Sequence, residues 1–248
     1  MKSILFALQH LTRLPLPRIP FDKVSCGRGT AFFPLAGLLI GAIMAAVIWA
    51  VEGWYLPSQL QAALLIVLMV VLTGGIHLDG FMDTIDGLFS GREREKCLEI
   101  MRDSRVGAFG VIGAICLLLF KFSLLANIPT LLLIKLLVVV PTISRWNMTM
   151  SIFVFPYARR EGLGTVYKKY CGLRELLLAT ILTAAVCGLV LGVDGAILML
   201  SGGLIAYLVG QKVNRVLDGL TGDIYGFINE LSEVLLLLIA YPLLKILG

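Results

Sequence analysis

Residues 32–51 read FFPLAGLLIGAIMAAVIWAV, and these 20 consecutive residues carry no charged side chain. An α-helix rises about 1.5 Å per residue, so a run of this length crosses the roughly 30 Å hydrocarbon layer of a bilayer. The whole chain agrees, because 58% of its 248 residues are hydrophobic and only 15% are charged. This excludes a secreted mini-domain, a coiled coil, a disordered chain and an ordinary cytosolic enzyme. Backbone groups in a bilayer must bond within their own segment, so the sequence predicts an all-α, polytopic integral membrane helical bundle.

Similar apolar runs recur along the chain, and we expect the whole of residues 1–248 to form one membrane domain. The N-terminal residues 1–29 hold an apolar run too short for a signal peptide, and we expect them to form an interfacial segment. The last three runs are the least sharply separated, so six spans are an alternative to seven. The seven expected spans are 30–51, 59–76, 106–127, 131–155, 175–193, 195–211 and 231–247.

The basic residues separate the two sides of the membrane. Seventeen of the 21 Lys and Arg residues lie before the first run or in three connections, and the other connections hold none. This bias predicts a cytoplasmic N-terminus and cytoplasmic loops at 77–105, 156–174 and 212–230. It also explains the net charge of +5 without a nucleic-acid partner. The five cysteines form no CxxC pair and indicate neither a zinc site nor a disulfide framework.

The densest group of acidic residues follows the second apolar run. Asp79, Asp83 and Asp86 stand at i, i+4 and i+7, so a helix would place all three on one face. Like charges repel at that spacing, and carboxylate oxygens suit a hard cation such as Mg²⁺. The alternative is the solvated face of an amphipathic helix. His77 lies beside this group, either as a ligand or base or as a hydrogen-bonding anchor at the membrane boundary.

Charged residues at two other places also need an explanation. Arg145 lies inside an apolar run, where it either pairs with a membrane carboxylate such as Glu233 or clamps a phosphate. Asp223 and Glu230 belong to a second acidic stretch, and Glu230 could simply be a charge stabilised at a helix N-terminus. Acids for a hard metal and arginines for phosphates on one membrane face indicate metal-dependent transfer that involves a diphosphate.

Several motifs then resemble those of a known family. GGIHLDGFMDTIDGLFSGR with IMRDSRVGAFG, together with PYARREGLG and GLTGDIYGFINELSE, is similar to the signature of the cobalamin synthase (adenosylcobinamide-GDP ribazoletransferase) family. The resemblance implies a bacterial inner-membrane, multi-pass enzyme of coenzyme B12 synthesis. It would transfer the adenosylcobinamide-phosphate group from adenosylcobinamide-GDP to the 3′-hydroxyl of α-ribazole or its 5′-phosphate, releasing GMP, with Mg²⁺ as cofactor.

The resemblance also implies roles for residues of this sequence. The expected metal ligands are Asp79, Asp83, Asp86 and Asp223. The expected catalytic residues are Asp86, Asp83 and His77, with Asp86 as a candidate acceptor of the hydroxyl proton. The expected substrate-binding residues are Arg102, Asp103, Arg105, Arg145, Arg159, Thr221 and Glu230.

Two other functions remain compatible with the sequence. A membrane prenyltransferase or a CDP-alcohol phosphotransferase also uses Mg²⁺ and aspartates on an inner face. A transporter would instead place its ionisable residues near the middle of the membrane. The expected partners are the two substrates and the lipid bilayer, and the sequence leaves open whether the protein is a homo-oligomer.

Overall fold

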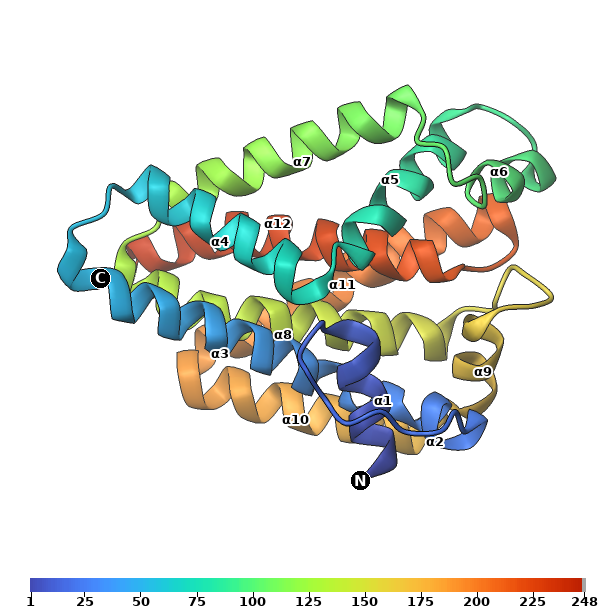
Figure 1. Cartoon of the computed structure of the whole chain (residues 1–248), viewed down its shortest axis with the longest axis horizontal. Helices are drawn as coiled ribbons and strands as arrows, with labels where there is room; N and C mark the ends of the chain where they lie inside the picture. Colours follow the sequence, from blue (N-terminus) through green and yellow to red (C-terminus); the bar gives the residue numbers. More distant parts are fainter. Residues whose placement is uncertain (247–248) are drawn as a thin grey trace.

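The computed structural model describes the backbone of residues 1–246 and the side chains of residues 1–241, and this part of the chain is all helical with no strand. The longer helices lie side by side along the long axis of the molecule (Figure 1). The elements are α1 (Lys2–Leu11), α2 (Lys23–Arg28), η1 (Gly29–Phe32), α3 (Phe33–Val51), η2 (Glu52–Trp54), α4 (Ser58–Thr73), α5 (Ile76–Phe89), α6 (Arg94–Ile100), α7 (Ala108–Asn127), α8 (Thr130–Val154), α9 (Leu163–Tyr170), α10 (Leu173–Leu191), α11 (Val193–Leu217) and α12 (Gly222–Ile246).

The number of membrane spans agrees with the expectation, but the second span differs from it. In the described chain six helices are long and apolar enough to cross a bilayer, and a seventh span requires α4 and α5 to count together. These two helices are bent by 92° at the break between them. Gly74 and Gly75 form the break with φ values of 66° and 71°, a conformation that glycine adopts without steric cost. The chain therefore turns inside the expected second span.

Two of the expected loops are largely helical. Helix α5 occupies residues 76–89 of the expected loop 77–105, and α12 begins at Gly222 rather than near residue 231. The sequence analysis assigned these stretches to loops because they contain charged residues. In the structure these acids belong to helices α5 and α12 and not to a loop. The far end of the last expected span, at residue 247, lies outside the described residues.

Helix α8 lies at the centre of the bundle. In its most apolar stretch 72% of the residues are buried, against 28% for α10. Helix α3 packs closely on it, because a Cβ atom added to Gly37 or Gly41 would lie 2.1 Å from the carbonyl oxygen of Pro141 or Leu137. Small residues at helix crossings are a common means of packing in membranes, where the backbones must approach to gain van der Waals contact.

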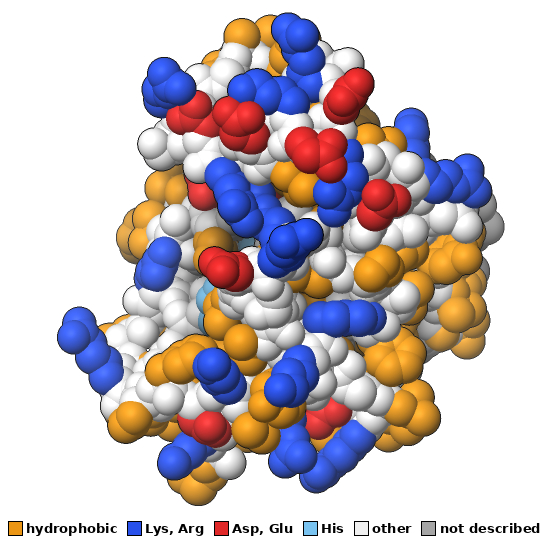
Figure 2. Space-filling view, turned by 90° about the vertical axis from the view of Figure 1, so that its right-hand side faces the viewer, with side chains coloured by type: hydrophobic (Ala, Val, Ile, Leu, Met, Phe, Trp, Pro, Cys, Tyr) orange, Lys and Arg blue, Asp and Glu red, His pale blue; other side chains and the backbone are white. Residues whose placement is uncertain are grey.

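The two ends of the bundle differ in charge. At one end the connections are residues 52–57, 128–129 and 192, and none of them contains a Lys or Arg. The other end carries α6, α9 and the α11–α12 turn, on the right of Figure 1. Figure 2 views this end and shows many Lys and Arg side chains around a hollow, with acidic side chains among them. The charge separation read from the sequence is therefore a separation in space.

We predict that the close approach of α3 and α8 limits what residue 41 can be. Gly41→Ala forces the Leu137 carbonyl away, and we expect a loss of about 1–3 kcal/mol of stability. Gly188→Ala is the matched control, because Gly188 is exposed in the interior of α10 and an added Cβ meets no atom within 4 Å. Melting of the detergent-solubilised proteins checks this, and equal melting temperatures would contradict the packing argument.

Candidate active site

The crossing of α5 and α12 brings the two acidic stretches together. A Cβ atom on Gly80 would lie 2.8 Å from the carbonyl oxygen of Asp223, and one on Gly226 would lie 3.0 Å from that of His77. Since both glycines are needed for this approach, the two backbones touch over about one helical turn. The residues on either side of Gly80 therefore face the first turn of α12.

Asp79, Asp83 and Asp223 form what we call the acidic cluster. Asp79 is exposed, and Asp83 and Asp223 are partly buried. Asp83 is within electrostatic range of Asp79, Asp223 and Asp86, and the opposing positive charge at this place is Arg159. Three carboxylates with one guanidinium leave an excess of negative charge, which favours the binding of a cation or a proton.

Asp86 does not join the acidic cluster, although it was expected to be a ligand and a candidate base. Its two oxygens accept hydrogen bonds from the backbone N–H groups of Gly107 and Gly110, each at 2.8 Å. An added Cβ on Gly107 or Gly110 would lie within 2.3 or 2.5 Å of the carboxylate, so both glycines leave room for it. Asp86 thus satisfies free N–H groups at the start of α7, where the helix dipole also favours a negative charge.

A loop pairing places Arg159 against the acidic cluster. The backbone N–H of Ala158 donates to the Leu220 carbonyl at 2.8 Å, and the Leu220 N–H donates to Pro156 at 2.9 Å. The guanidinium of Arg159 then lies 2.8 Å from a carboxylate oxygen of Asp223. Its second contact is with the Met101 carbonyl at 3.3 Å. Arg159, which the sequence analysis proposed as a substrate-binding residue, therefore lies next to the acids.

Thr221 has a structural task in the same turn. Its hydroxyl accepts a hydrogen bond from the Ile224 N–H at 3.4 Å and donates to Asp223 at 3.2 Å. It is therefore an N-cap of α12, and its side chain is fully buried. Its effect on the site is to orient Asp223, not to contact a ligand.

Arg94 was missed by the sequence analysis, and it holds the two loops together. It donates to the Leu217 carbonyl at 2.9 Å and to the Ala158 carbonyl at 3.0 Å. It also lies 3.4 Å from Asp218, which has φ 52° after the end of α11. Arg94 is one of several basic residues between positions 92 and 105, and nothing in the sequence distinguishes it from the others.

Two polar clefts open beside Arg159. They have volumes of about 460 and 490 Å³, and both are lined by Arg102, Arg159 and Glu161. The smaller cleft also reaches Gly222, the residue before Asp223, and is lined by Tyr157. The larger lies toward α6. Figure 2 shows the hollow at this charged end of the molecule. Of these residues, the sequence analysis named only Arg102 and Arg159 as site residues.

Asp103 and Arg105 do not line either cleft. They pair with each other at 2.7 Å in an exposed turn. The hydrogen bonds from Arg105 lower the pKa of Asp103 to about 2. The structure therefore gives these two residues, expected to bind substrate, a local contact with one another.

Arg145 and Glu230 do not reach the clefts, which corrects their assignment as substrate-binding residues. The guanidinium of Arg145 is fully buried and pairs with Glu233, and it lies 3.0 Å from the Ser144 hydroxyl. Lys121 lies 2.7 Å from Glu230 and 2.8 Å from Glu233. In the bundle interior each of these charges is stabilised by an opposite charge, and a phosphate cannot reach Arg145.

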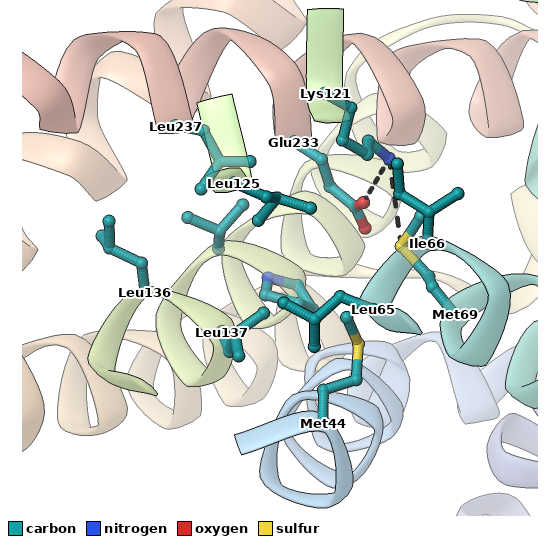
Figure 3. A pocket seen from close by; sticks show the side chains of 12 residues that line it. Met44, Leu65, Ile66, Met69, Lys121, Leu125, Leu136, Leu137, Glu233 and Leu237 are labelled. Carbon is teal, nitrogen blue, oxygen red and sulfur yellow. Dashed lines mark hydrogen bonds and ion pairs between the residues drawn. The ribbon is translucent and has the colours of Figure 1, made fainter. Parts of the chain in front are cut away.

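We refer to Lys121, Arg145, Glu230 and Glu233 as the buried ion cluster. Figure 3 shows Lys121 and Glu233 pointing toward each other among apolar side chains, with the sulfur of Met69 beside the ammonium. A cavity of about 20 Å³ adjoins them. The two positive and two negative charges of the buried ion cluster balance each other.

His77 belongs to this interior and not to the acidic cluster. Its side chain is 3% exposed, and Nδ1 lies 3.3 Å from the Arg145 guanidinium. Its position agrees with the anchor that the sequence analysis held as the alternative, and it gives no contact to a reacting group. Nε2 has no hydrogen-bond partner among the described residues.

The acidic cluster fits a hard divalent cation, although it is not a complete cage. Within the described residues no group of three or more His, Cys, Asp or Glu side chains is arranged to hold a metal ion. Mg²⁺ commonly takes one or two carboxylates and completes its shell with phosphate oxygens and water. Asp79 and Asp83, one helical turn apart and accessible from the charged end, offer such oxygens.

Comparison with known proteins supports a single family. The family model described as cobalamin-5-phosphate synthase matches residues 3–241. A protein of Desulfitobacterium hafniense named adenosylcobinamide-GDP ribazoletransferase is 43% identical, with 98% of each chain covered. Proteins of the same name from Acetivibrio thermocellus and Escherichia coli are 37% and 36% identical, covering 97% and 93% of this chain and 98% and 96% of their own lengths. No solved structure matches the chain.

We predict that the buried ion cluster sets the stability of the bundle. Arg145→Met leaves Glu233 short of positive charge, and we expect a loss of about 3–5 kcal/mol. Adding Glu233→Gln should restore part of the loss, because Lys121 and Glu230 still balance. Melting of the single and double variants in detergent checks this. If Arg145→Met melted like the unmodified protein but no longer bound a phosphate ligand, Arg145 would be a phosphate clamp after all.

Proposed function

Because this chain belongs to the cobalamin-5-phosphate synthase family, we propose that it is an adenosylcobinamide-GDP ribazoletransferase, as its relatives are named. It transfers the adenosylcobinamide-phosphate group to the 3′-hydroxyl of α-ribazole, or of α-ribazole 5′-phosphate, and releases GMP. One observation at the site carries the proposal. Arg159 lines both clefts and pairs with Asp223, which belongs to the acidic cluster with Asp79 and Asp83. Two clefts that share Arg102 and Arg159 can admit the two substrates of a transfer to one set of charged groups.

The donor diphosphate fits between Arg159 and the start of α12. The N–H groups in the first turn of a long helix favour a phosphate, and the helix dipole adds to this preference. Gly222 lines the cleft, is exposed and has no side chain, so it leaves room for an anion beside the Thr221 cap. Arg102 and Arg159 supply guanidinium groups, which match phosphate oxygens in pairs.

The transfer makes one P–O bond and breaks another. The 3′-oxygen of the ribazole attacks the phosphorus that carries the cobinamide, the bridging oxygen of the diphosphate leaves with GMP, and the hydroxyl proton passes to a carboxylate. We assign the proton to a carboxylate of the acidic cluster, since Asp86 is occupied by two backbone N–H groups and His77 is buried away from the clefts. Arg159 and the α12 N-terminus neutralise the leaving diphosphate oxygens.

A magnesium ion is part of this proposal. Asp79 and Asp83, with Asp223 as a third contributor, would hold it against the diphosphate, where it would neutralise charge that develops during the transfer. The support is the donor set, which is all carboxylate and carries more negative charge than Arg159 balances. Carboxylate oxygens are the ligands that this cation prefers.

We also propose that the charged end of the bundle faces the cytoplasm of a bacterial cell. The six or seven apolar helices fit a multi-pass protein of the inner membrane. The Lys and Arg residues gather at the end that holds the clefts, which is the arrangement that the positive-inside bias produces. Both substrates would then reach the site from the cytoplasm.

We predict that Asp79→Asn and Asp83→Asn each remove most of the GMP release from adenosylcobinamide-GDP while the protein still inserts and melts normally. The amide keeps the size of the side chain but loses the charge that attracts a hard cation. Asp194→Asn is the matched control and should keep full turnover, because Asp194 lies in the first turn of α11, at the end of the bundle away from the site. Normal turnover of either acidic-cluster variant at low Mg²⁺ would show that these acids form only a solvated helix face.

We predict that residues 92 and 129 are labelled from opposite sides of the membrane. Single cysteines are introduced at each position in a Cys116→Ser background, since Cys116 is the exposed native cysteine and the other four are buried. An impermeant thiol reagent applied to intact cells should reach residue 129 only. Labelling of residue 92 from outside would reverse the orientation proposed here.

A further inference from the structure

We propose that the smaller cleft binds the guanosine end of the donor and that the carboxylate of Glu161 selects guanine. The proposal rests on the proposed function, and it adds a base-reading site to it. The cleft is about 460 Å³, within the range of small-molecule pockets.

The cleft lies next to the proposed diphosphate site. Gly222 lines the cleft and precedes Asp223 of the acidic cluster, and Arg159 both lines the cleft and pairs with Asp223. A diphosphate between Arg159 and the α12 N-terminus would therefore have one of its two substituents in this cleft. A nucleoside is the smaller of the two, because the other is a corrinoid.

The walls of the cleft are aromatic. Tyr157, Tyr167 and His10 line it, and the rings of His10 and Tyr167 lie 5.6 Å apart. The Tyr157 ring lies against Gly164, where an added Cβ would be only 2.1 Å from it. Burial, aided by Arg13, lowers the pKa of His10 to about 4, so this wall carries no charge near neutral pH. Uncharged rings on one side suit the stacking of a purine base.

Glu161 supplies the polar group that a guanine needs. It lines the cleft and is exposed, and within the described residues it makes no hydrogen bond or ion pair. A carboxylate is an acceptor with two oxygens. Guanine presents two neighbouring donors on its Watson–Crick edge, N1–H and the 2-amino group. Adenine presents one donor and one acceptor there, and a benzimidazole base presents no N–H donor once it is joined to ribose. The carboxylate therefore favours guanine over the base of the acceptor.

The test compares GMP with IMP, which keeps N1–H but lacks the 2-amino group. GMP, the product, and IMP, its analogue, are both used as inhibitors of the transfer from adenosylcobinamide-GDP to α-ribazole. The unmodified enzyme should bind GMP at least about tenfold more tightly than IMP. Glu161→Gln has only one acceptor oxygen, so GMP binding should weaken by at least about tenfold and the preference over IMP should fall toward one. Glu161→Asp, which keeps the charge, should retain part of the preference.

The control is Glu93→Gln, an exposed glutamate at the start of α6 whose side chain makes no capping bond. It should keep the GMP preference. An unchanged preference in Glu161→Gln would overturn the inference while leaving the proposed function intact. So would weakened inhibition by α-ribazole 5′-phosphate with GMP inhibition unchanged, since that would make the cleft the acceptor site. If the unmodified protein released no GMP at all, the proposed function itself would fail.

Discussion

The charges buried in the middle of the bundle are the constraint on which the rest of the structure depends. Lys121 and Arg145 face Glu230 and Glu233 in a region where an unpaired charge is costly. They come from α7, α8 and α12, and His77 adds α5 through its contact with Arg145. Because the four helices must bring these charges into contact, their rotations about their own axes are set. The direction in which α5 presents its acids follows from that.

Once α5 is fixed, the three aspartates on its one face serve two tasks, because they lie at different positions along the helix axis. Asp86 bonds to the start of α7, while Asp79 and Asp83 lie near Asp223 in the first turn of α12. The glycines on both helices let the backbones approach, and this brings Asp223 close to the other two acids. The site therefore gathers like charges that only the bundle holds together. Such concentration of negative charge is unfavourable for the empty protein and favourable for a cation.

The sequence alone predicted the helical membrane fold and the separation of charge between the two ends of the bundle. It also proposed Asp79, Asp83, Asp223 and Arg159 as site residues, and the structure brings these four together. These signals are local, because an apolar run or a helical spacing is visible within about twenty residues. It did not predict that Asp86 caps α7 or that Glu230 pairs with Lys121, since each partner lies 24 or 109 positions away. For Arg145 the sequence left open an ion pair with a carboxylate or a phosphate clamp. Only the packing of α8 against α12, which brings Glu233 to Arg145, decides between them. Two consecutive glycines at 74 and 75 were a visible signal for the bend, but the apolar run across them hid it.

The loops at the charged end show how a site can be rigid without regular structure. The strand-like pairing of Ala158 with Leu220, and Arg94 on the carbonyls of both loops, hold residues 156–159 against the start of α12. Gly219 has φ 148°, and an added Cβ there would lie 2.7 Å from the Ala158 N atom, so this pairing needs glycine at that position. Arg159 is thereby held between the acids on one side and the clefts on the other. A guanidinium in that position can neutralise a carboxylate before a diphosphate arrives and a phosphate oxygen afterwards. The same contact that stabilises the empty site would thus prepare it for an anionic ligand, and it would free Asp223 for the proposed cation.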